Sequence, residues 1–152
     1  MNKKYDMLKL ENQLCFPLYA CSKETIRLYK RFLGPLDLTY TQYIVMMVMW
    51  EHKSMTVKEV GEILLLDSGT LTPVLKKLEA KGYLSRKRSK EDERTVMISI
   101  TEKGEKLKSE AAMIPEMMGD CIKLSQEEAS KLKKILDKTL KNMEREKKNE
   151  RS

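Results

Sequence analysis

Cys15 is the residue of this sequence whose type and position best suit redox chemistry. It lies near the start of a long predicted helix, where unpaired backbone N–H groups and the helix dipole favour a thiolate. Tyr19 follows one turn later and shares the same helix face. Because a thiolate is the form that a peroxide attacks, this arrangement predicts a redox-sensitive cysteine.

The other two cysteines, Cys21 and Cys121, carry different predictions. Cys21 lies about 120° around the helix from Cys15, so it is a poor partner within one chain and is expected to be a small core residue. Cys121 falls between Pro115 and a helix start at Ser125, where it could act as a resolving thiol. No apolar segment follows the charged N-terminus, so no secretory signal is expected and the default compartment is the cytoplasm. A reducing compartment would leave the three cysteines, which include no C-x-x-C pair, as free thiols.

Other reactive chemistry has little support in the sequence. His52 is the only histidine, and no Ser-His-Asp or Cys-His pair can be identified. The cysteines and His52 lack the spacing of a zinc site, and no glycine-rich phosphate loop is present. We therefore expect a protein that is not an enzyme and that needs neither a metal nor another cofactor.

Length and charge place these residues in one basic domain, predicted to span residues 1–152. The formal net charge is +7, and the window from Ser68 to Lys90 holds seven basic residues against one acidic residue, Glu79. Such a concentration of positive charge is typical of a surface that neutralises phosphates. The longest apolar run, Tyr43 to Trp50, is too short to span a membrane, so no membrane association is expected.

The basic window coincides with the pattern of a winged helix-turn-helix. A capping box at Thr39 opens an apolar core helix that runs to about His52, and a second at Thr56 opens a short helix. A further helix from Asp67 or Ser68 to about Gly82 contains Pro73, which predicts a local irregularity rather than a break. Alternating strands on both sides of residues 89–94 predict a β-hairpin wing. The fold class is therefore mainly α with a small β-hairpin.

This architecture predicts the residues that contact DNA. Small polar and basic residues of the second short helix should face the major groove, and basic residues of the hairpin should contact phosphates, with Arg94 at the minor groove steadied by Asp92. The predicted contacts are Ser68, Thr70, Thr72, Lys76, Lys77, Arg86, Lys87, Arg88, Asp92 and Arg94.

The two ends of the chain carry more apolar surface than a DNA-binding lobe over residues 39–101 needs. A long helix is predicted over residues 10–32, and Pro17 either bends it or marks its first turn. A second helix is predicted over residues 101–113 and is ended by Pro115. A third begins near Ser125 and is expected to fray from Glu144. We expect segments of about 8–33 and 102–146 to form a homodimer. Its two recognition helices would read double-stranded DNA with a pseudo-palindromic operator.

Three segments resemble the MarR family of winged-helix repressors, and within it the organic-hydroperoxide sensors called OhrR. They are Leu10-Glu-Asn-Gln-Leu-Cys-Phe16, Leu66-Asp-Ser-Gly-Thr-Leu-Thr-Pro73 and the wing from Arg86 to Arg94. The resemblance implies that organic hydroperoxide is the inducer and oxidises Cys15, whose sulfur accepts hydrogen bonds from Tyr29 and Tyr40, with Tyr19 nearby.

Helix geometry adds a condition to that implied site. Cys15 and Tyr29 would lie roughly 21 Å apart on one helix, so they could meet only across two subunits.

Several alternatives stay open at this level. Oxidised Cys15 could form a disulfide with Cys121, as the resemblance implies for some members, or with a small thiol. The fold could instead serve a regulator of a phenolic or drug-like ligand, a thiol peroxidase that uses Cys15, or a non-specific architectural DNA binder. A steep salt dependence without preference for a palindrome would mark the last of these.

Overall fold

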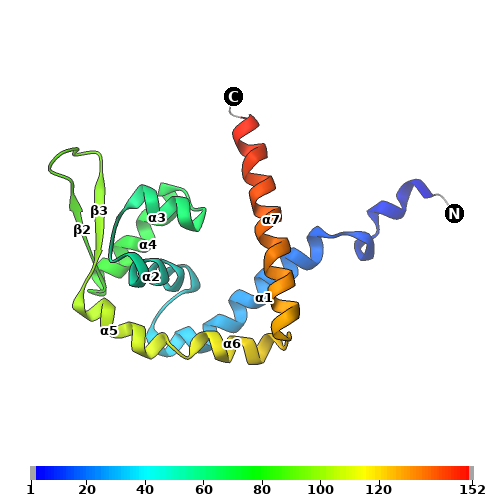
Figure 1. Ribbon diagram of the computed structural model, residues 1–152, viewed down its shortest axis with the longest axis horizontal. Coiled ribbons are helices and arrows are strands. Elements are labelled where there is room, and N and C mark those ends of the chain that lie inside the picture. Colours follow the sequence, from blue (N-terminus) through cyan, green and yellow to red (C-terminus); the bar gives the residue numbers. More distant parts are fainter. Residues whose placement is uncertain (1–2, 151–152) are drawn as a thin grey trace. The chain divides into compact units, whose positions relative to one another are not determined.

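The computed structural model describes residues 3–150, and their contacts divide the chain into two units between Ile114 and Pro115. The elements (Figure 1) are η1 (Lys3–Leu8), η2 (Leu10–Asn12), α1 (Cys15–Leu33), η3 (Gly34–Leu36), α2 (Tyr40–His52), β1 (Ser54–Thr56), α3 (Val57–Leu64), α4 (Ser68–Ala80), β2 (Leu84–Arg88), β3 (Val96–Ile100), α5 (Glu102–Ala111), α6 (Ile114–Ile122) and α7 (Gln126–Glu150). The predicted class, a mainly helical winged helix-turn-helix, is confirmed.

Side-chain caps set the start of each helix in the DNA-binding lobe. Both predicted capping boxes are present, with Thr39 accepting from the Gln42 N–H at the start of α2 and Thr56 accepting from the Glu59 N–H at the start of α3. Asp67 caps α4 by accepting from the Thr70 N–H. α4 continues unbroken through Pro73, as the sequence predicts.

The core of the lobe forms around α2, which is buried along most of its length. Leu71, Leu75 and Leu78 of α4 are fully buried and form its inward face. The Trp50 indole Nε1–H donates to the Gly104 carbonyl at 2.9 Å and so ties α2 to α5. Because these helices share one apolar core, the position of α4 depends on α2.

The predicted hairpin is strands β2 and β3, paired from Leu84 opposite Ile100 to Arg88 opposite Val96. A third strand, β1, pairs with the other edge of β3 and gives the order β1-β3-β2. β1 was not predicted, because its three residues are too few to show an alternating pattern. Figure 1 shows the hairpin loop reaching beyond the helices of this unit.

The start of the N-terminal helix differs from prediction. The long N-terminal helix begins at Cys15 instead of Leu10, because Leu10–Asn12 forms a separate 3-10 turn. Of the two roles predicted for Pro17, beginning the helix is the one observed, since it lies in the first turn of α1, where a proline costs no hydrogen bond.

The C-terminal third contains a helix that was not predicted. The helix capped by Thr101 ends at Ala111 instead of Met113, and Pro115 lies in the first turn of α6 rather than ending a helix. The capping box between Ser125 and Glu128 is present, and α7 runs to Glu150, past the charged segment from Glu144 for which fraying is predicted. Within residues 3–150, no helix is long and apolar enough to cross a membrane.

Replacement of Gly104 by Ala should destabilise the DNA-binding lobe. A Cβ at this position would lie 2.2 Å from the Tyr83 carbonyl oxygen and 3.0 Å from Cγ1 of Ile100. Because the nearest obstacle is backbone, we expect a loss of about 1–3 kcal/mol in the free energy of unfolding. Urea denaturation followed by circular dichroism measures this loss.

The matched control is Ser109→Ala on the exposed face of the same helix, which should change the unfolding free energy by less than about 0.5 kcal/mol. Equal stabilities of the Gly104→Ala and Ser109→Ala proteins would contradict the close packing of α5 against Tyr83.

Candidate nucleic-acid interface and redox site

The exposed face of α4 carries the residues predicted to read a major groove. Ser68, Thr70, Lys76 and Lys77 are exposed, and Thr72 is half-buried. The Thr70 hydroxyl donates to Asp67 at 3.0 Å, and the Thr70 N–H holds the pKa of that carboxyl below its usual value. The first turn of α4 is thus rigidly capped while its polar groups face solvent.

Asp92 organises the tip of the wing. Its carboxylate accepts from the Arg94 N–H at 3.0 Å and from the Thr95 hydroxyl at 3.1 Å. The Ser89 N–H donates to the Thr95 carbonyl at 2.8 Å and closes the loop. Asp92 therefore steadies Arg94 through the backbone, and the Arg94 side chain remains exposed.

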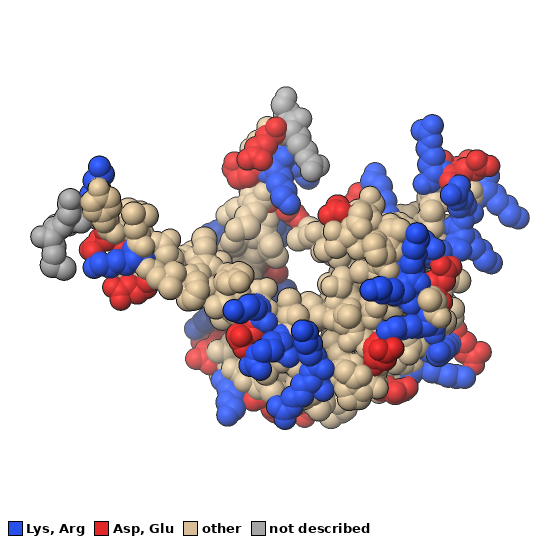
Figure 2. Space-filling view, turned by 180° about the vertical axis from the view of Figure 1, so that it is seen from behind, with Lys and Arg blue, Asp and Glu red and all other residues tan. Residues whose placement is uncertain are grey.

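The basic side chains of α4 and the wing fall into two groups. In the first group the cations have no acidic partner among residues 3–150. These are Lys76, Lys77, Lys87, Arg88, Lys90 and Arg94. Figure 2 shows blue side chains projecting from the hairpin, at the right of the view. This group keeps its full charge for phosphates.

Lys81 and Arg86 form the second group, whose charges are paired within the lobe. Arg86 was predicted to contact phosphate, but its guanidinium lies 2.8 Å from the Glu79 carboxylate and is partly buried between α4 and β2. This hydrogen bond lowers the pKa of Glu79. Arg86 thus joins the wing to the recognition helix.

Cys15 is the first residue of α1 and is exposed. At this position the helix N–H groups have no partners within the helix. Tyr19 lies one turn further along and is 63% exposed. The segment before Cys15 is folded by side chains of the motif that carried the family resemblance, since the Asn12 amide donates to the Asp6 carbonyl at 2.7 Å and the Gln13 amide to the Met7 carbonyl.

A tyrosine cluster lies at the other end of α1. Tyr29 packs against Tyr40 with ring centroids 4.7 Å apart and against Tyr43 at 5.7 Å. Burial, followed by the two neighbouring tyrosines, raises the pKa of Tyr29 to about 12, so its hydroxyl remains a hydrogen-bond donor at physiological pH. Tyr43 was not predicted to join this cluster, although its position three residues after Tyr40 places both on one helix face.

One chain does not bring the predicted redox residues together. Cys15 and Tyr29 lie on the same unbroken helix, 14 residues apart and so roughly 21 Å along its axis. Cys21 is exposed, so the expectation that it is a core residue is wrong for the single chain, whose α1 buries only Leu33. Cys121 is half-buried in the last turns of α6.

Comparisons with known proteins identify the family of this chain. The family described as "Transcriptional regulator SarA/Rot" matches residues 27–111. The "Organic hydroperoxide resistance transcriptional regulator" of Bacillus subtilis (strain 168) is 52% identical over 136 residues, which cover 90% of this chain and 92% of the relative. The chain belongs to the MarR family of transcriptional regulators. Its similarity to the Bacillus protein confirms the predicted organic-hydroperoxide-sensing branch.

Solved structures extend the family relationship to the fold. A structure described as reduced AbfR bound to DNA has a TM-score of 0.75 and 36% identity, and covers 94% of this chain and 99% of AbfR. A mutant of MarR from E. coli, complexed with operator DNA, has a TM-score of 0.72 and 26% identity, over 84% of this chain and 93% of MarR. AbfR, from Staphylococcus epidermidis, has also been solved with its disulfide formed.

Proposed function

We propose that this MarR-family regulator is a homodimeric repressor that binds a pseudo-palindromic operator and releases it when an organic hydroperoxide oxidises Cys15. The observation that carries the proposal is the placement of an exposed cysteine at the start of α1, with a cluster of tyrosine hydroxyls at the far end of the same helix. Two antiparallel copies of α1 would bring each cysteine to the partner's tyrosines.

DNA binding is supported by the exposed polar and basic groups of α4 and the wing. Ser68, Thr70, Thr72 and Lys76 would face the major groove, with Lys77, Lys87 and Arg88 on phosphates and Arg94 at the minor groove. The reduced AbfR and E. coli MarR structures were each solved with DNA. Arg86 is left out of this surface because Glu79 holds its guanidinium.

Dimerisation is supported by apolar side chains that the described chain leaves exposed at both of its ends. α7 has no buried residue, although apolar residues recur along it. The exposed apolar residues are Tyr5, Met7, Leu8, Leu10, Leu14, Phe16, Tyr19 and Ile26 before and within α1, and Leu132, Ile135, Leu140 and Met143 on α7. Surfaces of this kind are stable in water when a second copy covers them. We assign residues 8–33 and 102–146 to dimerisation and 39–101 to DNA binding.

The sensing step is a two-electron oxidation of sulfur. The Cys15 thiolate attacks the O–O bond of the hydroperoxide, so an S–O bond forms and the alkoxide leaves, taking up a proton to become the alcohol. The sulfur is oxidised to the sulfenic acid and the peroxide is reduced. Hydroxyl donors from Tyr29 and Tyr40 of a partner subunit would stabilise the attacking thiolate. Oxidation converts the hydrogen-bonded thiolate to a sulfenic acid and so disrupts the hydrogen bonds between the two subunits. The dimer then shifts away from its DNA-binding conformation.

The sulfenic acid can then condense with a second thiol, forming a disulfide and releasing water. We propose Cys121 of the partner subunit as that thiol, because it is half-buried near the end of α6 and therefore partly accessible. After treatment with cumene hydroperoxide, wild-type protein should run as a covalent dimer on a non-reducing gel, and Cys121→Ser should run as a monomer.

Cys21→Ser is the matched control because Cys21 is also exposed on α1, and it should still form the covalent dimer. A covalent dimer that persists in Cys121→Ser would exclude Cys121 as the resolving thiol. A wild type that releases DNA without forming the dimer would instead indicate that the sulfenic acid or a small-molecule disulfide is the released state.

A further inference from the structure

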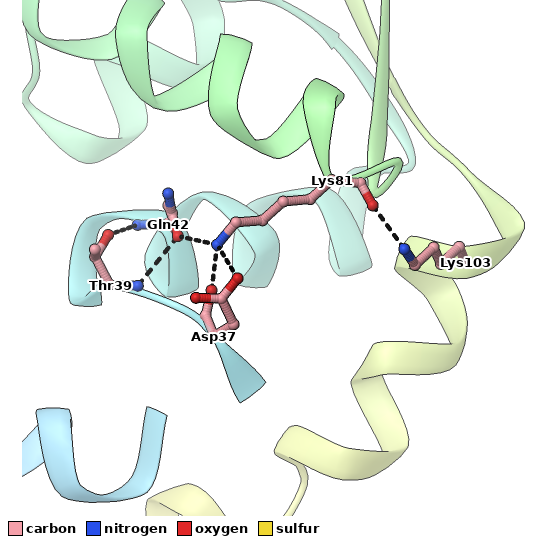
Figure 3. A network of polar contacts seen from close by, with 5 residues as sticks. All are labelled: Asp37, Thr39, Gln42, Lys81 and Lys103. Atoms are coloured by element: carbon pink, nitrogen blue, oxygen red, sulfur yellow. Dashed lines mark hydrogen bonds and ion pairs between the residues drawn. The ribbon is translucent and has the colours of Figure 1, made fainter. Parts of the chain in front are cut away.

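Lys81 directly follows the recognition helix α4, yet its side chain does not join the cations of the DNA-binding surface. Only 26% of this side chain is exposed, whereas Lys76 and Lys77 of the same helix are exposed. Figure 3 shows the Lys81 ammonium reaching across to the segment that precedes α2. This lysine thus contacts the joint between α1 and α2.

Three oxygens of that joint accept from the ammonium. Lys81 Nζ lies 3.0 Å from the Asp37 carboxylate, donates to the Asp37 carbonyl and lies 3.3 Å from Gln42 Oε1 (Figure 3). Asp37 has a left-handed backbone (φ 52°), so the turn presents its carbonyl and its carboxylate to the same cation. We call the contact of Lys81 with Asp37 and Gln42 the corner latch.

The corner latch is fixed at both ends. Gln42 is buried and its Oε1 also accepts from the Thr39 N–H at 3.1 Å, so the latch acts on the first turn of α2. At the other end, the Lys81 carbonyl accepts from Lys103 Nζ at 2.8 Å, and the Lys81 N–H donates to the Lys77 carbonyl. The main chain that carries the ammonium is therefore held against α4 and α5.

The tyrosine cluster lies on the same joint. Tyr29, on the last turns of α1, packs on Tyr40, which is the first residue of α2. A change in the hydrogen bonding of Tyr29 or Tyr40 would therefore act on the segment between Asp37 and Gln42, which Lys81 contacts. The latch thus connects the sensor side of the lobe to the C-terminal end of the recognition helix.

We propose that the corner latch transmits the displacement of the α1–α2 joint to α4, which makes Lys81 a positioning residue for redox-controlled release of DNA. This inference rests on the proposed function. A partly exposed ion pair adds little to stability. The ion pair matters instead for geometry. The ammonium binds three acceptors on Asp37 and Gln42, and the main chain that carries it follows directly on α4, so a movement of one side is passed to the other.

The Lys81→Met variant tests the proposal. The measured quantity is the ratio of operator Kd after and before cumene hydroperoxide, by fluorescence anisotropy on an operator selected from a random DNA pool. Without the latch, movement of the joint should reach α4 less completely, and the ratio should fall by about five-fold relative to wild type. Intact mass should show the same oxidation of Cys15 in both proteins.

Three further variants make the result specific. Lys77→Met, on the exposed face of α4, should weaken both Kd values alike and leave the ratio unchanged. Lys81→Arg keeps the charge and should keep the ratio within two-fold of wild type. Asparagine tolerates the left-handed backbone, so Asp37→Asn removes only the carboxylate charge and should lower the ratio. If Lys81→Met does not fold, the ratio measured for Asp37→Asn tests the corner latch.

The outcomes separate the latch from the function it rests on. A wild type that never releases DNA would refute the proposed function itself. A wild type that releases DNA, together with ratios in Lys81→Met and Asp37→Asn within two-fold of wild type, would overturn the latch and leave these residues a structural role. A larger fall of the ratio in either variant supports it.

Discussion

A Cys15→Ser variant should keep its operator affinity at a concentration of cumene hydroperoxide that releases the wild type. Serine preserves the size of the side chain but offers no thiolate for attack on the O–O bond. We expect the wild type to lose about 100-fold in affinity on oxidation, at the upper end of typical coupling between two sites, and Cys15→Ser to change by less than two-fold. Fluorescence anisotropy on the selected operator measures both.

Cys21→Ser is the control for general sensitivity of exposed thiols, because Cys21 lies on the same helix and is also exposed. This variant should release DNA as the wild type does. Release of Cys15→Ser by the same peroxide would show that the sensing group lies elsewhere in the chain.

Replacement of Arg94 by Ala should weaken operator binding by about 30-fold, which corresponds to about 2 kcal/mol. The reason is the fixed position of Arg94 at the wing tip, where Asp92 accepts from its backbone N–H at 3.0 Å while its side chain is exposed. Because the backbone of the wing tip is already ordered before binding, the tip loses little conformational entropy when it binds DNA. Removal of the guanidinium therefore recovers little entropy to offset the lost contact.

Comparison with Arg88→Ala separates a groove contact from a phosphate contact. Arg88, at the end of β2, should contribute mainly through charge, so its loss should weaken binding to all sequences and lower the salt dependence. Lys147→Ala, near the end of α7 and outside the segment assigned to dimerisation, controls for the loss of one positive charge. Operator affinity of Arg94→Ala equal to that of Lys147→Ala would contradict the wing contact.

Local sequence signals predicted most of the DNA-binding lobe. The capping boxes at Thr39 and Thr56 and the cap at Asp67 mark helix starts through interactions between residues three apart, which a sequence displays directly. The alternation of Val96, Ile98 and Ile100 marked β3 in the same way. These signals need no knowledge of contacts between distant residues.

The features that were missed depend on distant contacts or on very short segments. β1 has three residues and exists because Ser54–Thr56 pairs with β3, more than 40 positions later. The ion pairs that withdraw Lys81 and Arg86 from the basic surface involve Asp37 and Glu79, which only the fold places beside them. A count of charges along the chain therefore overstates the surface that is free for DNA.

The sensor shows the same division between local and distant information. Helix geometry alone places Cys15 near a helix start and separates it from Tyr29. Both features are found in α1, which begins at Cys15 and continues unbroken past Tyr29. The packing of Tyr29 on Tyr43 requires the turn between α1 and α2, which brings the end of one helix to the start of the next.

The stoichiometry of release tests most directly whether oxidation of Cys15 causes loss of DNA. The operator complex is titrated with cumene hydroperoxide while anisotropy and remaining peroxide are followed, and dithiothreitol is then added. We predict that release is complete when about one equivalent per subunit has been consumed, that consumption then stops, and that dithiothreitol restores binding. Continued turnover of peroxide with a thiol donor, or full oxidation of Cys15 with the DNA still bound, would contradict this account.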